Sequence, residues 1–363
     1  MSLDRAANGY TDAPHILCGL RGVGKTVLLT QMGKIAQNKE WVVCQLEAER
    51  GKDLRHMIGD GLYEPLYEIS QDAGPNPAKK FLRALKTMLS FKASYDTSET
   101  WNFGLDLSGA TGGAANSGSL ALDTKNIIRD VAAAMQEKGK GMALLIDEAQ
   151  DLNEEELATL SVCAQMAASE RIPFLLGLAG LPTLRKKICD AKSYAERFSF
   201  KNIERLTEEE AREAFQQPAE KVDVEWSPEA LSLALHHSGQ YPYFIQQFGK
   251  ESWDAERNSQ NTISHTAAEE GIRKGQEELD KGFFLARWDR CTPKEREYLR
   301  AMCPEGTEGI RSSMVAQKMA RDLNSVAPLR ANLVNKGMIF SPDHGIVSFT
   351  VPGMAAFINR QPE

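Results

Sequence analysis

The octet GLRGVGKT, residues 19–26, brings glycines, a lysine and a hydroxyl group together in the spacing G-x-x-x-x-G-K-T. Glycine at a tight turn lets main-chain N–H groups approach a phosphate without a Cβ in the way. Lys25 would place a cation beside the β- and γ-phosphates, and the Thr26 hydroxyl would be a ligand of Mg²⁺. The pattern predicts a nucleotide site whose contacts come from Gly19, Leu20, Arg21, Gly22, Val23, Gly24, Lys25, Thr26 and Val27.

Two adjacent carboxylates, Asp147 and Glu148, end the apolar run ALLI at residues 143–146. At the tip of a buried strand they would be costly unless a cation or a water molecule made use of them. We expect Asp147 to hold Mg²⁺, usually through water, and Glu148 to act as the general base on an attacking water. The other interpretation is an acidic pair that opens the next helix, where the helix dipole favours negative charge. Octet and acidic pair together predict a nucleotide site, and ATP is the expected nucleotide because no guanine-reading N-K-x-D sequence is present. A small-molecule kinase is an alternative, although the modules that follow the core would be unusual for one.

Alternating strands and helices across residues 15–203 must position these groups. The helix candidate TVLLTQMGKIAQNK, residues 26–39, directly follows the glycines of the octet. Such alternation predicts right-handed crossovers and an α/β fold, in which a parallel sheet carries helices on both faces. The strand candidates are HILCGL (15–20), WVVCQLEA (41–48), GMALLIDEA (141–149), IPFLLGLAG (172–180) and the weaker RFSFKNIERL (197–206).

An insertion at about residues 50–125 separates the second strand candidate from the third. Residues 53–92 are expected to be helical. Residues 101–123 alternate apolar and polar side chains around a centre rich in Gly, Ser and Asn, which predicts a hairpin or a mobile loop.

After residue 206 the pattern becomes helical. Thr207 followed by Glu210 is a capping-box signature, and a later segment starts with Ser-Pro and stops at Gly239. Three short helices and two strands about a PDHG turn then end the chain, an order typical of a winged helix. The predicted domains are a core at 1–206, a helical lid at 207–285 and a winged helix at 286–363.

With the octet, LLIDEAQ and the trailing modules in place, the chain resembles AAA+ ATPases of the origin-recognition type. It is equally similar to archaeal and bacterial relatives near the STAND switch ATPases, and the likeness extends to KSYAERFSF, SGQYPYFIQ and KGMIFSPDHGIVSFTVP. The resemblance implies a P-loop NTPase core, ATP and Mg²⁺ as ligands, and a nucleotide between core and lid. It also implies that the state of the nucleotide changes the angle between them.

The same resemblance adds Arg197 to Lys25 and Glu148 as a candidate catalytic residue. It stands just before the fifth strand candidate, where such proteins often carry an arginine finger that reaches a neighbour's γ-phosphate. This implies an ATP-dependent homo-oligomer. A surface arginine paired with Glu196 or Glu204 is the alternative, and the sequence leaves both open.

Two departures from the family pattern concern the groups that sense the γ-phosphate. The fourth strand ends LLGLAGLP without a polar sensor, and Thr183 is the nearest hydroxyl. In the lid, Tyr241 and Tyr243 stand near the place of a sensing arginine, although packing within the lid would also explain them. Fewer charged sensors indicate slow hydrolysis and a switch rather than a fast motor.

The winged-helix segment 311–336 is locally basic, with Asp322 as its single acid. A winged helix inserts its third helix into the DNA major groove, which makes Ser325, Arg330 and Asn332 the candidates for base contacts. Phosphate contacts would come from Arg311, Lys318 and Lys336. A module that docks a protein is the alternative, and Asp343 in a wing without arginine weakens the prediction of double-stranded DNA.

Composition narrows the class of protein. A net charge of -7 over 363 residues argues against a non-specific nucleic-acid packager. No apolar run approaches the roughly 20 residues of a membrane span. The first 14 residues lack a signal-peptide core, and the six cysteines form no metal or disulfide pattern, so a cytoplasmic protein is expected. Two functions remain: a slowly hydrolysing ATP switch whose winged helix binds DNA or a protein, or a nucleotide-stabilised scaffold with negligible turnover.

Overall fold

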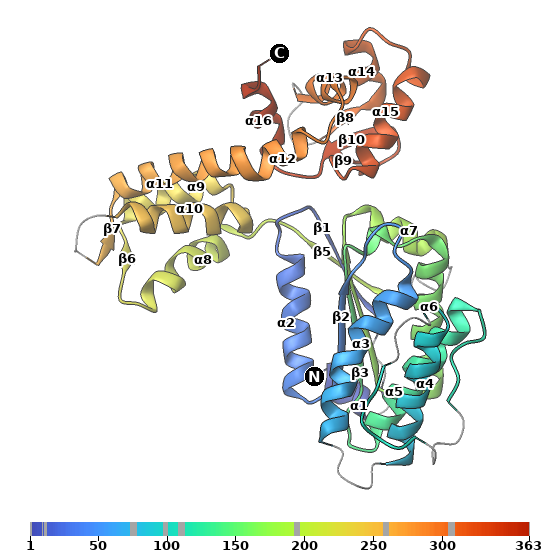
Figure 1. The fold of residues 1–363 in the computed structure, drawn as a ribbon. Helices are drawn as coiled ribbons and strands as arrows, with labels where there is room; N and C mark the ends of the chain where they lie inside the picture. The colour runs from blue at the N-terminus through green and yellow to red at the C-terminus, as the bar shows by residue number, and fades with distance from the viewer. Residues whose placement is uncertain are drawn as a thin grey trace. The chain divides into compact units, whose positions relative to one another are not determined.

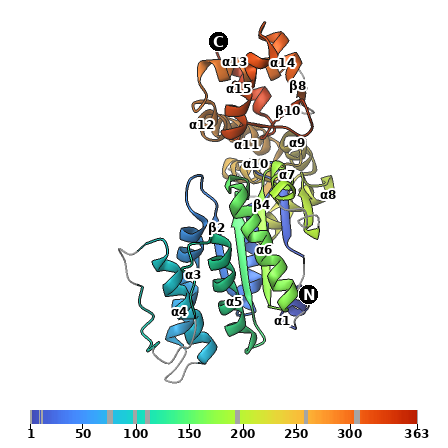
Figure 2. The same ribbon diagram turned by 90° about the vertical axis from the view of Figure 1, so that its right-hand side faces the viewer.

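The computed structural model divides the chain into two compact units (Figures 1 and 2). Unit 1 comprises Met1–Cys18 and Lys25–Asn202, and unit 2 comprises Gly19–Gly24 and Ile203–Glu363. The structure describes residues 2–8, 10, 13–72, 78–96, 101–107, 113–191, 197–256, 261–303 and 309–362.

A five-stranded sheet with the order β2-β3-β4-β1-β5 organises unit 1. The pairs β1–β4, β2–β3 and β3–β4 are parallel, and β4 lies between β1 and β3. Every residue of β3 and β4 is buried, as expected for central strands covered on both faces. The strands occupy the predicted segments: β1 His15–Gly19, β2 Val42–Glu47, β3 Met142–Asp147, β4 Phe174–Gly180 and β5 Ser199–Ile203.

The strand order explains where the helices of unit 1 lie. The step from β1 to β2 crosses the sheet in one direction and the later steps return, so right-handed crossovers put α2 on one face and α3 to α7 on the other. Figure 1 shows this separation of α2 from α3, α4 and α5. The helices are α1 Ser2–Ala7, α2 Lys25–Asn38, α3 Leu54–Gln71, α4 Lys79–Ala93, α5 Leu120–Gln136, α6 Glu154–Glu170 and α7 Thr183–Ala191, with a short 3-10 turn η1 at Ala149–Asp151.

The insertion between β2 and β3 is helical where predicted. Of the two alternatives for residues 101–123, the hairpin is not found in the described residues, and the mobile loop stays a prediction. The described parts of this segment, 101–107 and 113–119, contain no strand, and residues 108–112 lie outside the described chain. Leu120 opens α5, and the Ser119 hydroxyl accepts a hydrogen bond from the Leu122 N–H at 3.4 Å. A short alternation of apolar and polar residues also fits the first turn of a helix. The Ser119 cap and the helical spacing of the apolar residues that follow favour the helix over a strand.

Unit 2 begins with a helical part. Thr207 and Glu210 form the predicted capping box of α8, and Ser227 caps α9, which ends at Gly239 in the left-handed region. A short parallel pair, β6 Glu225–Trp226 with β7 Thr262–Ile263, was not predicted. The helices are α8 Glu208–Glu220, α9 Pro228–Ser238, α10 Pro242–Ala255, α11 His265–Glu278, the π-helix η3 Leu279–Phe284 and α12 Leu285–Trp288.

The C-terminal part of unit 2 has the predicted three helices and a pair of antiparallel strands. Val347 of β10 pairs with Ile310 of β8, and Ser348 pairs with Phe340 of β9. Strand β8 and helix α16 were not predicted. The elements are α13 Pro293–Met302, β8 Ile310–Arg311, α14 Ser312–Lys318, α15 Leu323–Asn335, β9 Ile339–Phe340, β10 Ile346–Phe349 and α16 Met354–Arg360.

Candidate nucleotide site

The glycines of the octet, which we call the phosphate loop (residues 19–26), serve different physical needs. Gly22 and Gly24 have positive φ angles of 83° and 94°, a region that other residues rarely adopt. At position 19 glycine is needed to avoid a steric clash, because a Cβ there would lie 2.3 Å from the Ile203 carbonyl oxygen. Gly22 and Gly24 therefore adopt backbone conformations that favour glycine, as expected for the motif.

Directly after the glycines, Lys25 begins α2 and its side chain is buried. The N-terminus of this 14-residue helix presents main-chain N–H groups and the positive end of the helix dipole, both of which favour an anion. Val27, predicted as a nucleotide contact, is 65 % exposed on the same first turn.

Thr26 and Asp147 meet in unit 1 although they are 121 residues apart. The Thr26 Oγ1 donates a hydrogen bond to Asp147 Oδ2 at 2.5 Å, and Asp147 Oδ1 accepts from the Glu148 N–H at 2.8 Å. Asp147 is only 9 % exposed. A hydroxyl and a carboxylate in contact are oxygen ligands of the kind Mg²⁺ prefers, so the two residues fit the metal that the motif implies.

Glu148 follows the strand in a strained conformation. Its φ of 47° is in the left-handed region, and its Oε2 accepts a hydrogen bond of 2.5 Å from Gln150 Nε2. Gln150 Oε1 in turn accepts from the Leu181 N–H at 2.9 Å. Gln150 was not among the residues predicted from the sequence. Its one signal was an amide side chain two residues after the acidic pair.

Tyr241 and Tyr243, at the start of α10, contact the main chain of the phosphate loop within unit 2. The Tyr241 hydroxyl donates to the Arg21 carbonyl, and the Tyr243 N–H donates to the Gly22 carbonyl at 3.2 Å. Burial raises the pKa of Tyr241, so this hydroxyl stays a neutral donor at physiological pH. The Arg21 N–H donates to the Thr350 carbonyl at 3.3 Å. Both tyrosines therefore contribute to holding the loop.

Arg197 and Thr183, two further candidates from the sequence, belong to unit 1. Arg197 is exposed just before β5, and Thr183 is the first residue of α7. No ion pair between Arg197 and Glu204 is found among the described residues, and Glu196 lies outside them. The role of Arg197 as an arginine finger remains a prediction.

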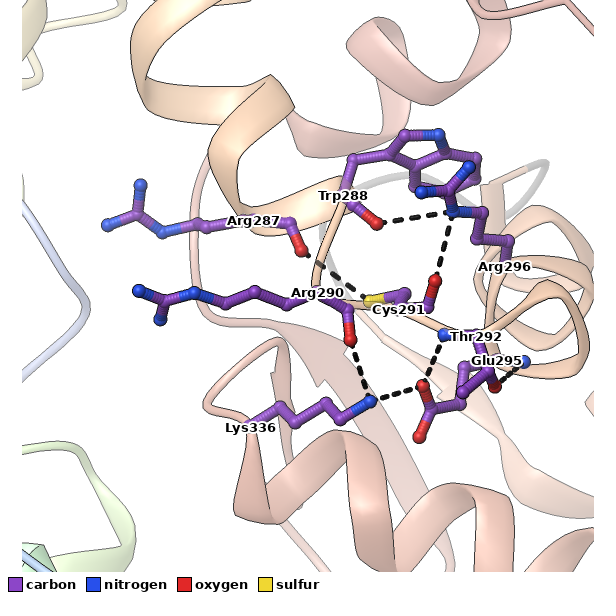
Figure 3. Close-up of polar contacts among 8 residues, drawn as sticks. All are labelled: Arg287, Trp288, Arg290, Cys291, Thr292, Glu295, Arg296 and Lys336. Atoms are coloured by element: carbon purple, nitrogen blue, oxygen red, sulfur yellow. Dashed lines mark hydrogen bonds and ion pairs between the residues drawn. The ribbon is translucent and has the colours of Figure 1, made fainter.

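Basic residues of the C-terminal part are largely engaged within unit 2. Lys336 Nζ donates to Glu295 Oε2 at 2.5 Å and to the Arg290 carbonyl at 2.8 Å, as Figure 3 shows. Burial works to raise the pKa of Glu295, but the Lys336 ammonium and the Thr292 N–H outweigh it and lower the pKa below its ordinary value. Arg321 forms an ion pair with Glu297 at 3.0 Å, and Arg330 donates a hydrogen bond to the Ser341 hydroxyl at 2.6 Å.

The described residues hold neither a helix long and apolar enough to cross a membrane nor a group of three or more His, Cys, Asp or Glu side chains that could bind a metal.

Two family models match the chain. The model described as an AAA domain matches residues 9–188, and one described as a domain of unknown function (DUF8462) matches residues 281–358. No curated protein matches the chain.

Several solved structures align with nearly the whole chain. A Walker-type ATPase of Pyrococcus abyssi is 17% identical, with 98% of this chain and 94% of that one covered at a TM-score of 0.57. Cdc6p from Pyrobaculum aerophilum is 13% identical (96% and 86% covered, TM-score 0.47). The Holliday junction branch migration motor RuvB of Thermotoga maritima is 15% identical (100% and 92% covered, TM-score 0.43).

The first of these likenesses establishes the fold, and the matched AAA domain includes the phosphate loop and the acidic pair. Residues 9–188 are therefore an AAA domain, in agreement with the AAA+ ATPases that the sequence resembles.

Proposed function

We propose that this protein binds Mg·ATP and hydrolyses it slowly, as a molecular switch. The observation that carries the proposal is the contact between Thr26 and Asp147 at 2.5 Å, formed where α2 begins behind glycines with positive φ. Main-chain N–H groups of the phosphate loop and the Lys25 ammonium would neutralise the phosphates. Thr26 and Asp147 would hold Mg²⁺, which supplies charge neutralisation at the phosphate oxygens when bound.

Glu148 is the proposed general base. Its carboxylate follows Asp147 directly, and Gln150 holds one of its oxygens at 2.5 Å. It would orient the attacking water and accept its proton. Slow turnover is supported by the end of β4, where Gly180 and Leu181 offer no polar side chain toward a γ-phosphate.

Calorimetric titration and phosphate release test this function. We expect Lys25→Ala to abolish Mg·ATP binding, whereas Glu148→Gln keeps binding and loses turnover by about 100-fold or more. Lys34→Ala, which changes an exposed lysine of the same helix, is the matched control and should behave like the parent. Absence of binding heat and of thermal stabilisation by Mg·ATP would contradict the proposal. Equal phosphate release by the parent and Glu148→Gln would favour the alternative, a nucleotide-stabilised scaffold.

Arg197 extends the proposal to assembly, because an exposed arginine beside β5 could complete the site of a second copy. Mg·ATP should then increase the particle size, and Arg197→Ala should lower turnover. A particle size that is the same with and without Mg·ATP would leave Arg197 as a surface residue.

The C-terminal part is proposed to be a winged helix that binds a partner. The helix–strand order α13-β8-α14-α15-β9-β10 and the sheet order β8-β10-β9 support this assignment. Engagement of Arg321, Arg330 and Lys336 inside unit 2 favours a protein partner over the phosphates of DNA. DNA retention at low salt that falls steeply as salt rises would reverse this preference.

A further inference from the structure

We propose that Gln150 is a positioning residue for hydrolysis, which holds the Glu148 carboxylate and ties it to the end of β4. The inference rests on the proposed role of Glu148 as the general base. It concerns residues of unit 1 alone, and Gln150 itself is 6 % exposed.

The orientation of the Gln150 amide follows from its partners. The Leu181 N–H can only donate, so it faces the carbonyl oxygen Oε1, at 2.9 Å. The amino group Nε2 is thereby turned toward Glu148 Oε2, at 2.5 Å. One amide thus joins the carboxylate after β3 to the main chain after β4.

The surrounding backbone is arranged to allow this link. The left-handed conformation of Glu148, φ 47°, starts the η1 turn that brings residue 150 back toward residue 148. Lys187 of α7 donates to the Gln150 carbonyl at 2.6 Å and holds the turn. A Cβ on Gly180 would lie 2.6 Å from Gln150 Oε1, so glycine is needed there for the amide to approach β4.

The functional consequence concerns β4, which lies between β1 and β3. The strand ends at Gly180, Leu181 follows it, and neither residue offers a polar side chain. Gln150 supplies the polar connection instead, so any shift at the end of β4 is transmitted to the position of Glu148. A displaced general base slows the chemical step without weakening the binding of nucleotide.

The decisive variant is Gln150→Glu. It keeps an oxygen that accepts from the Leu181 N–H but replaces the donor to Glu148 by a second carboxylate. We expect kcat to fall roughly 10- to 100-fold, with KM and the Kd for Mg·ATP within about twofold of the parent. Gln165→Glu makes the same chemical change at an exposed position of α6 and should leave kcat unchanged.

A double mutant separates positioning from a structural role. If Gln150 acts through Glu148, adding Gln150→Glu to Glu148→Gln should cost little further kcat, because residues that act as a unit are not additive. Should Gln150→Glu fail to fold, Gln150→Met, which is neutral and similar in length, should show the same loss of kcat.

Three outcomes would overturn the inference. A folded Gln150→Glu variant with the kcat of the parent would show that Gln150 only satisfies Leu181. A full additional loss of kcat in the double mutant would show that it acts independently of Glu148. Undiminished turnover of Glu148→Gln alone would remove the proposed general base, and with it the role of Gln150, although Mg·ATP binding would then persist.

Discussion

Asp147, the last residue of β3, accepts hydrogen bonds within unit 1 through both of its carboxylate oxygens. One comes from the Thr26 hydroxyl and the other from the Glu148 N–H. A buried carboxylate needs such partners, because an unpaired one would pay the full cost of desolvation. The same oxygens that stabilise the folded unit are therefore available in one place to hold a divalent cation.

We predict that Thr26→Val separates metal binding from nucleotide binding. Valine keeps the β-branched shape but removes the hydroxyl, so the affinity for ATP with Mg²⁺ should fall roughly tenfold, which corresponds to about 1.4 kcal/mol. Affinity for ATP in excess chelator should not change. Calorimetry under both conditions measures the difference.

Thr30→Val is the matched control, one turn further along α2, where the hydroxyl accepts from Gln45 at 3.1 Å instead of meeting Asp147. It should bind Mg·ATP like the parent. Equal losses with and without Mg²⁺ in Thr26→Val would show that the hydroxyl has no part in metal binding.

Among the elements, α3 and α6 are joined at their N-termini by one carboxylate. Glu156 completes the capping box of α6, where its Oε2 accepts from the Asn153 N–H at 2.8 Å. Its Oε1 accepts from the Leu54 N–H, the first residue of α3, at 3.1 Å. Because the first N–H groups of a helix have no partner inside it, this one side chain satisfies donors of two helices.

We predict that Glu156→Gln destabilises unit 1 by about 2 kcal/mol, because the amide would turn a donor toward one of two N–H groups that need an acceptor. Chemical denaturation followed by helix content measures the loss. Glu155→Gln, the exposed neighbour in the same turn, should change stability by no more than about 0.5 kcal/mol. Equal stabilities of the two variants would refute the shared cap.

At the scale of the whole molecule, unit 2 depends on a contact that joins the end of a long helical run to the C-terminal elements. Lys336, directly after α15, binds the Arg290 carbonyl and the buried Glu295 of α13. Glu295 is 2 % exposed, so its charge depends on this partner. The arrangement makes the stability of unit 2 depend on pH.

We predict that Lys336→Met lowers the free energy of unfolding by about 2 kcal/mol at pH 7. The pKa of Glu295 in the folded protein is below its ordinary value of 4.5, so the pair contributes its full stability above that pH. The contribution disappears as pH falls below 4.5 and Glu295 is protonated.

Thermal melts between pH 7 and pH 3 measure the difference between parent and variant, which should shrink toward acid pH. Lys294→Met, an exposed lysine of α13, should match the parent throughout. A difference that stays constant across this range would mean that the pair does not depend on the charge of Glu295.

Features that depend on neighbours in the chain could be predicted from the sequence alone. The phosphate loop, the strands of the sheet and the capping box of Thr207 each depend on residues within a few positions of one another, because glycine conformations and caps are local preferences. The hairpin, one of two alternatives for residues 101–123, is absent from the described residues, because a short apolar–polar alternation is equally compatible with the first turn of a helix.

Contacts between distant residues were decided only by the tertiary structure. Thr26 meets Asp147 across 121 positions, and Gln150 reaches Leu181 across 31. The sequence motif predicted the contact between Thr26 and Asp147, but the order of the strands in the sheet produces both contacts. The partner of Lys336, Glu295, could not be predicted either, because the sequence identified Lys336 only as a basic residue suited to phosphate contacts. A side chain's type limits which bonds it can make, whereas the fold decides which partner comes within reach.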